Sequence, residues 1–104
     1  MFARKIRMKL NPSSAIEFSR LYEQQVLPVL RQQPGFCDGM TLVSGERAEA
    51  IAISFWDKRA DADNFGDTAY AALIDGLAGV LAEAPEVSTL VVSNSTPHQV
   101  AVRN

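Results

Sequence analysis

Near the middle of the chain the sequence reads Glu49-Ala50-Ile51-Ala52-Ile53-Ser54-Phe55-Trp56-Asp57. Large and small residues alternate here, and this period of two places Ile51, Ile53 and Phe55 on one face of a β-strand. From Ala50 to Phe55 neither face carries a charge. Strands without a charged face are typical of the interior of a sheet. The segment is therefore predicted to be the central strand.

The end of this strand is a candidate pocket floor. Trp56 is the only tryptophan of the chain, and Asp57 follows it. An aspartate at this position can accept hydrogen bonds from the free amides at the start of a helix. We therefore expect the strand to deliver an aromatic side chain to the sheet edge and then to turn into a helix.

Composition indicates one globular domain of 104 residues, with 47% hydrophobic and 21% charged residues. The net charge of -2 gives no electrostatic basis for binding nucleic acid or an anionic membrane, so neither partner is expected. The basic residues Arg4, Lys5, Arg7 and Lys9 alternate with Ile6, Met8 and Leu10. That period favours a strand with one solvent-facing side over a nucleic-acid-binding arm.

The single cysteine, Cys37, rules out a disulfide within the chain and fits a reducing, cytoplasmic location. No apolar run approaches the ~20 residues that a membrane-spanning helix needs. We also expect no signal peptide.

The first half of the chain is predicted to contain a strand, a helix and a second strand. Residues 3–10 alternate as a strand, and Ser14 with Glu17 has the spacing of a capping box at the start of a helix. Pro28 lies inside the helix and predicts a kink near Gln24 to Pro28. Pro34-Gly35 ends it, and 36–43 reads as the strand that turns into the central one.

After Trp56 the sequence predicts a second helical region and a last strand. A short helix is expected from about 58 to 65, with an interruption at Gly66 and a second segment capped by Asp67 that reaches Leu81. Residues 86–95 form the last predicted strand. The tail, 96–104, is expected to be frayed or to add a strand at 100–102 to the sheet of a partner subunit.

The predicted order of strand, helix, strand, strand, helix, strand is the ferredoxin-like βαββαβ arrangement, an α+β fold with a four-stranded antiparallel sheet. Two helices cover only one face of such a sheet, yet these strands offer apolar residues to both faces. An uncovered apolar face of that size is typical of a partner site. The sequence therefore predicts a homodimer in which two sheets pack face to face.

Three motifs resemble the antibiotic biosynthesis monooxygenase family. They are Pro34-Gly35-Phe36 after the amphipathic helix, then Gly39-Met40, then Phe55-Trp56-Asp57 at the end of the central strand. The resemblance implies a dimeric α+β barrel domain over 1–95. It also implies three activities known in this superfamily: cofactor-independent oxygenation of polycyclic phenols, quinol formation and haem degradation.

The haem-degrading branch matches poorly. Its tryptophan corresponds to Trp56, but Ile6 stands where its asparagine is expected, and no histidine occurs from 57 to 81. Tyrosine is an alternative iron ligand, and Tyr70 lies in the right region. The comparison favours a protein without a bound cofactor.

Cofactor-free oxygenation needs an apolar slot, hydrogen-bond partners for a developing phenolate, and exclusion of water. We expect Trp56 and Tyr70 to be the catalytic residues. The residues expected to bind substrate are Tyr22, Phe36, Asn64 and Phe65. Trp56 also fits a position in the core or the dimer interface, and Tyr22 and Tyr70 also fit positions in the core. If the site is assigned correctly, Trp56→Ala abolishes turnover and leaves a folded dimer.

Other chemistry has weaker support. The only histidine, His98, lies in the tail as an expected solvent-facing residue, and Cys37 has no histidine near it in sequence. Asp57, Asp61, Asp63 and Asp67 fit a solvated helix, and no calcium-loop or zinc spacing occurs, so no metal is expected. Three hypotheses remain: an oxygenase acting on a small apolar aromatic or quinol-type compound, a non-catalytic ligand-binding barrel, and a haem-binding relative.

Overall fold

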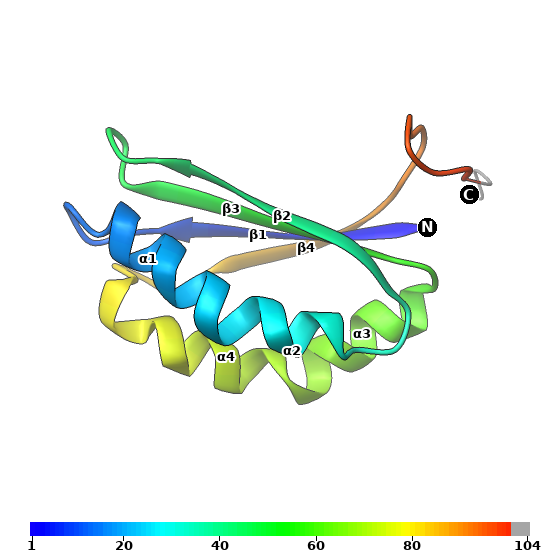
Figure 1. The fold of residues 1–104 in the computed structure, drawn as a ribbon, viewed down its shortest axis with the longest axis horizontal. Helices are drawn as coiled ribbons and strands as arrows, with labels where there is room; N and C mark the ends of the chain where they lie inside the picture. Colours follow the sequence, from blue (N-terminus) through cyan, green and yellow to red (C-terminus); the bar gives the residue numbers. More distant parts are fainter. Residues whose placement is uncertain (101–104) are drawn as a thin grey trace.

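The computed structural model describes residues 1–100 of the 104-residue chain (Figure 1). The elements are β1 (Phe2–Lys9), α1 (Ala15–Leu21), the π-helical turn η1 (Tyr22–Val26), α2 (Leu27–Arg31), β2 (Phe36–Ser44), β3 (Glu49–Trp56), α3 (Arg59–Thr68), α4 (Tyr70–Leu77), the 3-10 turn η2 (Ala78–Val80) and β4 (Glu86–Val91). In this part of the chain, no helix is long and apolar enough to cross a membrane.

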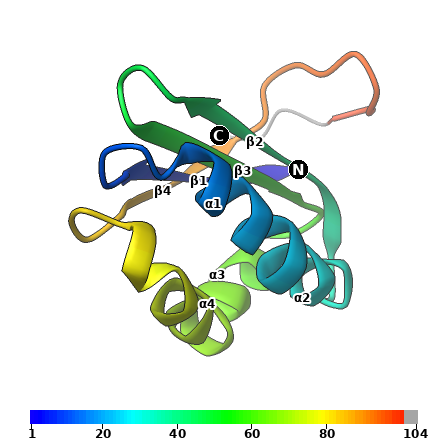
Figure 2. The same cartoon turned by 60° about the vertical axis from the view of Figure 1, so that its left-hand side comes forward.

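The four strands form one antiparallel sheet in the order β2-β3-β1-β4. This confirms the predicted βαββαβ fold. β3 lies between β2 and β1, so the prediction of a central strand is also confirmed. All helices lie on one side of the sheet, as Figures 1 and 2 show from two directions.

The two faces of β3 divide between the helices and the outside. Ala50, Ala52, Ser54 and Trp56 are buried beneath the helices, whereas Ile51, Ile53 and Phe55 are half-buried on the opposite side. The small side chains lie on the helix side, which leaves room there for the large side chains of the helices. We call the uncovered side the open face, and its large apolar residues are Met40, Leu42, Ile51, Ile53, Phe55 and Leu90.

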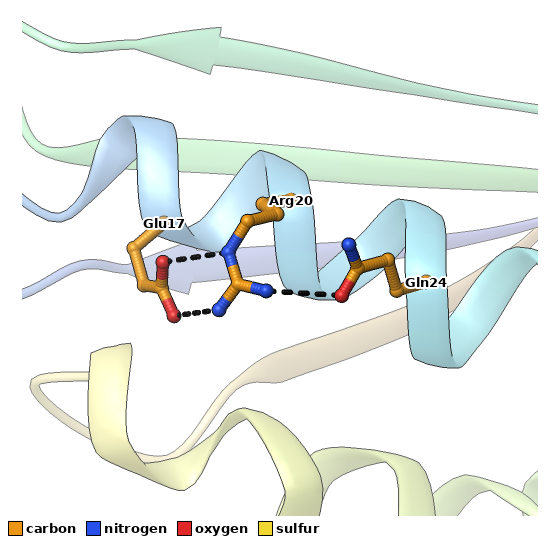
Figure 3. A network of polar contacts seen from close by, with 3 residues as sticks. All are labelled: Glu17, Arg20 and Gln24. Carbon is orange, nitrogen blue, oxygen red and sulfur yellow. Dashed lines mark hydrogen bonds and ion pairs between the residues drawn. The ribbon is translucent and has the colours of Figure 1, made fainter.

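The predicted capping box at the start of α1 is wrong. Ser14 does precede the helix, but its side chain caps no backbone amide. Glu17 instead receives hydrogen bonds from Arg20, one turn further along the exposed side of the helix (Figure 3). Arg20 also donates to Gln24, so the three side chains form a line along the helix surface. The carboxylate is held by a guanidinium and does not reach back to the helix start.

Where a kink was predicted near Gln24 to Pro28, the structure has the π-helical turn η1. The N–H of Leu27 donates to the carbonyl of Tyr22, five residues earlier. Pro28 has no N–H to donate and its ring clashes with the preceding turn, so the regular pattern cannot continue through it. A widened turn of this kind absorbs the mismatch within the helix.

The predicted interruption at Gly66 is wrong, because α3 continues through Gly66 and Asp67 to Thr68 and the break falls at Ala69. Gly66 has a packing role. A Cβ at this position would lie 2.7 Å from Nη1 of Arg4, so the guanidinium packs directly against the helix backbone.

The chain after the sheet differs from the prediction. β4 ends at Val91 and not at Ser95. The following segment rises on the side of the sheet opposite the helices (Figure 1). There His98 is half-buried and contacts the carboxylate of Asp38 in β2, whereas a solvent-facing residue was expected. The strand expected at 100–102 lies mostly outside the described residues.

Candidate functional site

A small cavity lies between the sheet and the helices, with a volume of about 20 Å³. Twelve residues line it: Ile6, Met8, Tyr22, Val26, Leu30, Ala52, Ser54, Phe65, Tyr70, Leu73, Ile74 and Leu77. The only polar side-chain atoms among them are the hydroxyls of Tyr22, Tyr70 and Ser54. This volume suffices for about one water molecule. The site is a small, mainly apolar cavity.

The cavity is nearest to solvent beneath α4. Tyr70, Leu73 and Ile74 are half-buried, whereas every other lining residue is buried. These three residues belong to α4, which begins at the break at Ala69 and is followed by the 3-10 turn η2. Short helical segments with half-buried contacts open at lower free-energy cost than a core strand does. α4 is therefore the part of the cavity wall that lies closest to solvent.

Trp56 lies behind the cavity and not in its wall. It is fully buried, with 0% of its surface exposed, and its ring packs between Phe36 and Phe65. The ring centroids lie 5.6 Å from Phe36 and 5.2 Å from Phe65. Its Nε1–H donates to Oγ of Ser54 at 2.9 Å. This N–H is therefore already used, and Trp56 acts on the cavity through Phe65 and Ser54.

Ser54 is the polar group that this arrangement presents to the cavity. Its Oγ accepts the hydrogen bond from Trp56, which leaves the hydroxyl hydrogen free to be donated elsewhere. Ser54 is 5% exposed and lies on β3 directly opposite Arg4 of β1. The site thus has a hydroxyl donor at the sheet end where the aromatic residues gather.

Arg4 is buried beside the same end of the cavity. Only 7% of its surface is exposed, and its guanidinium lies over two rings of the cavity wall. The Cζ atom is 4.6 Å from the ring centroid of Tyr70 and 5.7 Å from that of Phe65. Burial lowers the pKa of Arg4, while Tyr70, Asp63 and Asp67 oppose that shift. A guanidinium is basic enough to keep its charge throughout the physiological range.

The two tyrosines are hydrogen-bond donors at neutral pH and not bases. Burial raises the pKa of Tyr22 to about 12. Burial also raises the pKa of Tyr70, and the neighbouring charge of Arg4 partly opposes this shift. Both phenols therefore keep their protons near pH 7. The lining residues supply hydroxyl donors but no group poised to remove a proton.

Three of the six residues predicted to form the site, Tyr22, Phe65 and Tyr70, do line the cavity. Trp56 and Phe36 form the layer behind it. Asn64 is exposed on α3, outside the cavity, where its carbonyl accepts a hydrogen bond from Thr68.

The reactive groups outside this set lie apart from the cavity. Burial, with the carboxylates of Asp57 and Asp38, raises the pKa of the Cys37 thiol, and its Sγ lies 3.5 Å from the carbonyl of Gly35. His98 contacts Asp38, which lies opposite Phe55 of the open face, away from the cavity. Within residues 1–100, no three His, Cys, Asp or Glu side chains cluster as metal ligands.

Sequence reasoning missed Arg4 and Ser54. Arg4 shares its strand face with Ile6 and Met8, so the alternation itself places it on the buried side. It was grouped with Lys5, Arg7 and Lys9 because of its charge, although Lys5, Arg7 and Lys9 lie on the other face. Ser54 shares its face with Ala50 and Ala52, and a polar residue in that small-residue stripe was the available signal.

The fold is that of antibiotic biosynthesis monooxygenases. Solved structures with this fold match most of the chain. No protein-family model and no curated protein matches the sequence. The sequence identities to these structures are between 13% and 18%, so what they establish is the fold.

Three of these structures are informative. An antibiotic biosynthesis monooxygenase is 17% identical, with a TM-score of 0.69 over 90% of this chain and 100% of that one. SnoaB from Streptomyces nogalater, a cofactor-independent oxygenase, is 13% identical, with a TM-score of 0.72 over 93% and 97%. A monooxygenase from the gene ActVA-Orf6 of Streptomyces coelicolor, in complex with the ligand nanaomycin D, is 18% identical, with a TM-score of 0.70 over 99% and 92%.

Proposed function

We propose that this protein is a cofactor-independent monooxygenase that acts on a small aromatic or quinol-type compound bound between the sheet and the helices. The observation that carries the proposal is the cavity, which combines apolar walls with hydroxyls of Tyr22, Tyr70 and Ser54. Such a slot, apolar with a few convergent polar groups, is the usual form of a small-molecule site. The shared fold with SnoaB, a cofactor-independent oxygenase, supports the reaction class.

In this chemistry the substrate supplies the electrons. A phenol or quinol that has lost its hydroxyl proton is electron-rich enough to reduce dioxygen. One oxygen atom then enters the substrate and the other leaves as water. The chain contributes an apolar slot for the ring, hydroxyl donors for the substrate oxygen, and walls that exclude water. Trp56 contributes by holding Ser54 and Phe65 in place.

Substrate binding requires the site to open. The cavity volume of about 20 Å³ is far below the ~150 Å³ of a cavity that takes up benzene. We infer that α4 moves away from the sheet when the substrate enters. The break at Ala69 is a natural hinge for that movement.

The test is oxygen uptake by purified, metal-free protein with a panel of hydroquinones, naphthols and anthrones. Tyr70→Phe removes a hydroxyl from the cavity wall and keeps the ring, so it is expected to lower the rate at least tenfold. Phe18→Leu is the matched control, because Phe18 is fully buried in the same core but does not line the cavity.

The outcomes separate the hypotheses. Substrate-dependent uptake that falls in Tyr70→Phe and persists in Phe18→Leu supports the oxygenase. Saturable binding by calorimetry without any oxygen uptake would instead identify a non-catalytic ligand-binding barrel. Equal rates in both variants would contradict the placement of the reaction in this cavity.

We further propose that the protein is a homodimer, paired through the open face. Met40, Leu42 and Leu90 on this face are each at least half exposed, at 52%, 53% and 52%. Large apolar residues at that exposure on one sheet face are typical of a protein interface. A twofold axis would pack the open face of one subunit against the open face of the other, so both apolar surfaces would be covered at once.

Leu42→Asp tests this interface. A carboxylate introduced on this apolar face would lose its hydration in the dimer, so we expect the variant to sediment as a monomer while the wild type sediments as a dimer. Ile16→Asp is the control, because Ile16 is 87% exposed on α1, away from the open face. A wild type that is monomeric at micromolar concentration would refute the dimer.

A further inference from the structure

Arg4 is a buried cation without a fixed partner. Its Nε is fully enclosed and has no hydrogen-bond partner among the described residues. Arg4 also takes part in none of the ion pairs formed by residues 1–100. Buried arginines are normally paired, because an unpaired charge or donor away from water costs folding free energy. A side chain kept in this state is a candidate for a ligand contact.

The position of Arg4 is set by the packing around it. The guanidinium lies over the Tyr70 ring, with Cζ 4.6 Å from the centroid, and against the backbone at Gly66. Any larger residue at 66 would meet the guanidinium, since a Cβ there lies 2.7 Å from Nη1. Asp63 and Asp67 of α3 are near enough to influence its titration, but both are exposed and neither pairs with it. The charge is therefore held in place by stacking and not by a carboxylate.

This charge adjoins the cavity at its polar end. Arg4 lies opposite Ser54 in the β1–β3 ladder, and the two rings beneath its guanidinium, Phe65 and Tyr70, belong to the cavity wall. Ser54 has a hydroxyl hydrogen to donate, because its oxygen already accepts from Trp56. Ser54 thus presents an unused donor on the cavity wall, and the charge of Arg4 lies on the adjacent strand, against two rings of that wall but not itself among the lining residues.

We propose that the positive charge of Arg4, packed against two rings of the cavity wall, makes this site selective for ligands that carry an ionised oxygen, with Ser54 Oγ as the hydrogen-bond donor. The inference rests on the proposed use of the cavity as a small-molecule site and adds the ligand's charge state and the residue that selects it. The shared chemistry is one anionic oxygen on a flat apolar body, as in a phenolate, an enolate or an aromatic carboxylate. Because the cavity wall offers no base, such a ligand loses its proton to solvent and binds as the anion.

The consequence is measurable without turnover. A positive charge within about 4–6 Å lowers the pKa of an acidic group by about 1–3 units. The probe is 4-nitrophenol, whose phenolate is distinguished from the phenol by its visible absorbance, and nitrobenzene is the matched ligand that cannot ionise. With wild-type protein we expect the pKa of bound 4-nitrophenol to fall by at least one unit. Benzoate, tested alongside, distinguishes a carboxylate ligand from a phenolate one.

Arg4→Met is the principal variant, because methionine fills similar volume and leaves no charge to bury. We expect it to abolish the pKa shift and to weaken 4-nitrophenol binding at least tenfold at pH 7, with nitrobenzene affinity changed less than twofold. Gly66→Ala is the second variant. It keeps the arginine and displaces its guanidinium, so it is expected to reduce the shift even if Arg4→Met does not fold.

Different results would overturn the ligand site and the role of Arg4. If nitrobenzene binds but 4-nitrophenol shows no pKa shift, the cavity stands as a ligand site and the role of Arg4 is overturned. An unchanged shift in folded Arg4→Met or in Gly66→Ala overturns that role as well. If neither aromatic compound nor benzoate binds, both the proposed function and the role of Arg4 are overturned.

Discussion

The hydrogen bond from Trp56 to Ser54 can be measured as a coupling free energy. Trp56→Phe keeps an aromatic ring but removes Nε1–H, the donor of the 2.9 Å hydrogen bond. Loss of a hydrogen bond costs ~0.5–1.5 kcal/mol. The ring becomes smaller by roughly 40 Å³, which at ~24 cal/mol per Å³ adds about 1 kcal/mol in a site that does not collapse. We expect Trp56→Phe to lower the free energy of unfolding by about 2 kcal/mol.

Ser54→Ala removes the acceptor and leaves Nε1–H of Trp56 buried without a partner. That costs ~1–3 kcal/mol. In the double variant neither group remains, so its loss of stability is expected to fall short of the sum of the single losses by about 1–1.5 kcal/mol. The assay is urea unfolding of all four proteins followed by far-UV circular dichroism, since Trp56 fluorescence is absent from two of them.

An additive result would refute the reasoning. If the double variant equals the sum of the single variants within ~0.3 kcal/mol, Trp56 and Ser54 do not share this hydrogen bond in solution. Trp56→Ala, the variant suggested by the sequence alone, is a poor activity test. Removal of a fully buried tryptophan costs about 3–5 kcal/mol, a large part of the ~5–15 kcal/mol that stabilises a domain of this size.

Three further perturbations test the packing. Burial raises the pKa of Tyr22 to about 12, from ~10 in the unfolded chain. Because the folded state holds this proton more tightly, up to about 2–3 kcal/mol of stability is lost as pH rises from about 10 to about 12. Urea unfolding of Tyr22→Phe should lack that part of the alkaline loss, and an identical pH profile would contradict the burial. Gly35→Ala should lower stability by at least ~1–2 kcal/mol. Gly35 has φ +77°, and a Cβ there would lie 2.7 Å from Cβ of Asp61. A thermal midpoint equal to that of the wild type would argue against this backbone conformation at Gly35. Gly76→Ala should instead stabilise α4 by up to ~1 kcal/mol. The only close neighbour of a new Cβ is Oε1 of Gln25, an exposed side chain that can move aside. A lower thermal midpoint than that of the wild type would show that Gln25 does not move aside.

The order of strands and helices along the chain and the central position of β3 were predictable because the signals are local. The period of two from Ala50 to Phe55 is a property of neighbouring residues, and short turns constrain which strands pair. Helix details were less predictable. The end of α3 was misplaced at Gly66 because propensity favours a break at glycine, whereas packing against Arg4 requires glycine there.

The sequence alone determined that this chain forms a βαββαβ domain, and it predicted as candidate site residues three aromatic residues that do line the cavity, Tyr22, Phe65 and Tyr70. Tertiary structure decided how those residues are used. Alternation assigns a side chain to a face of a strand, but it does not say what lies across from it. Only the pairing of β1 with β3 and the packing of α4 above them bring Ser54 and Tyr70 to one cavity, with Arg4 beside them. The charge of Arg4 suggested solvent, and its contacts, which come from residues at least 50 positions away in sequence, bury it beside the candidate site.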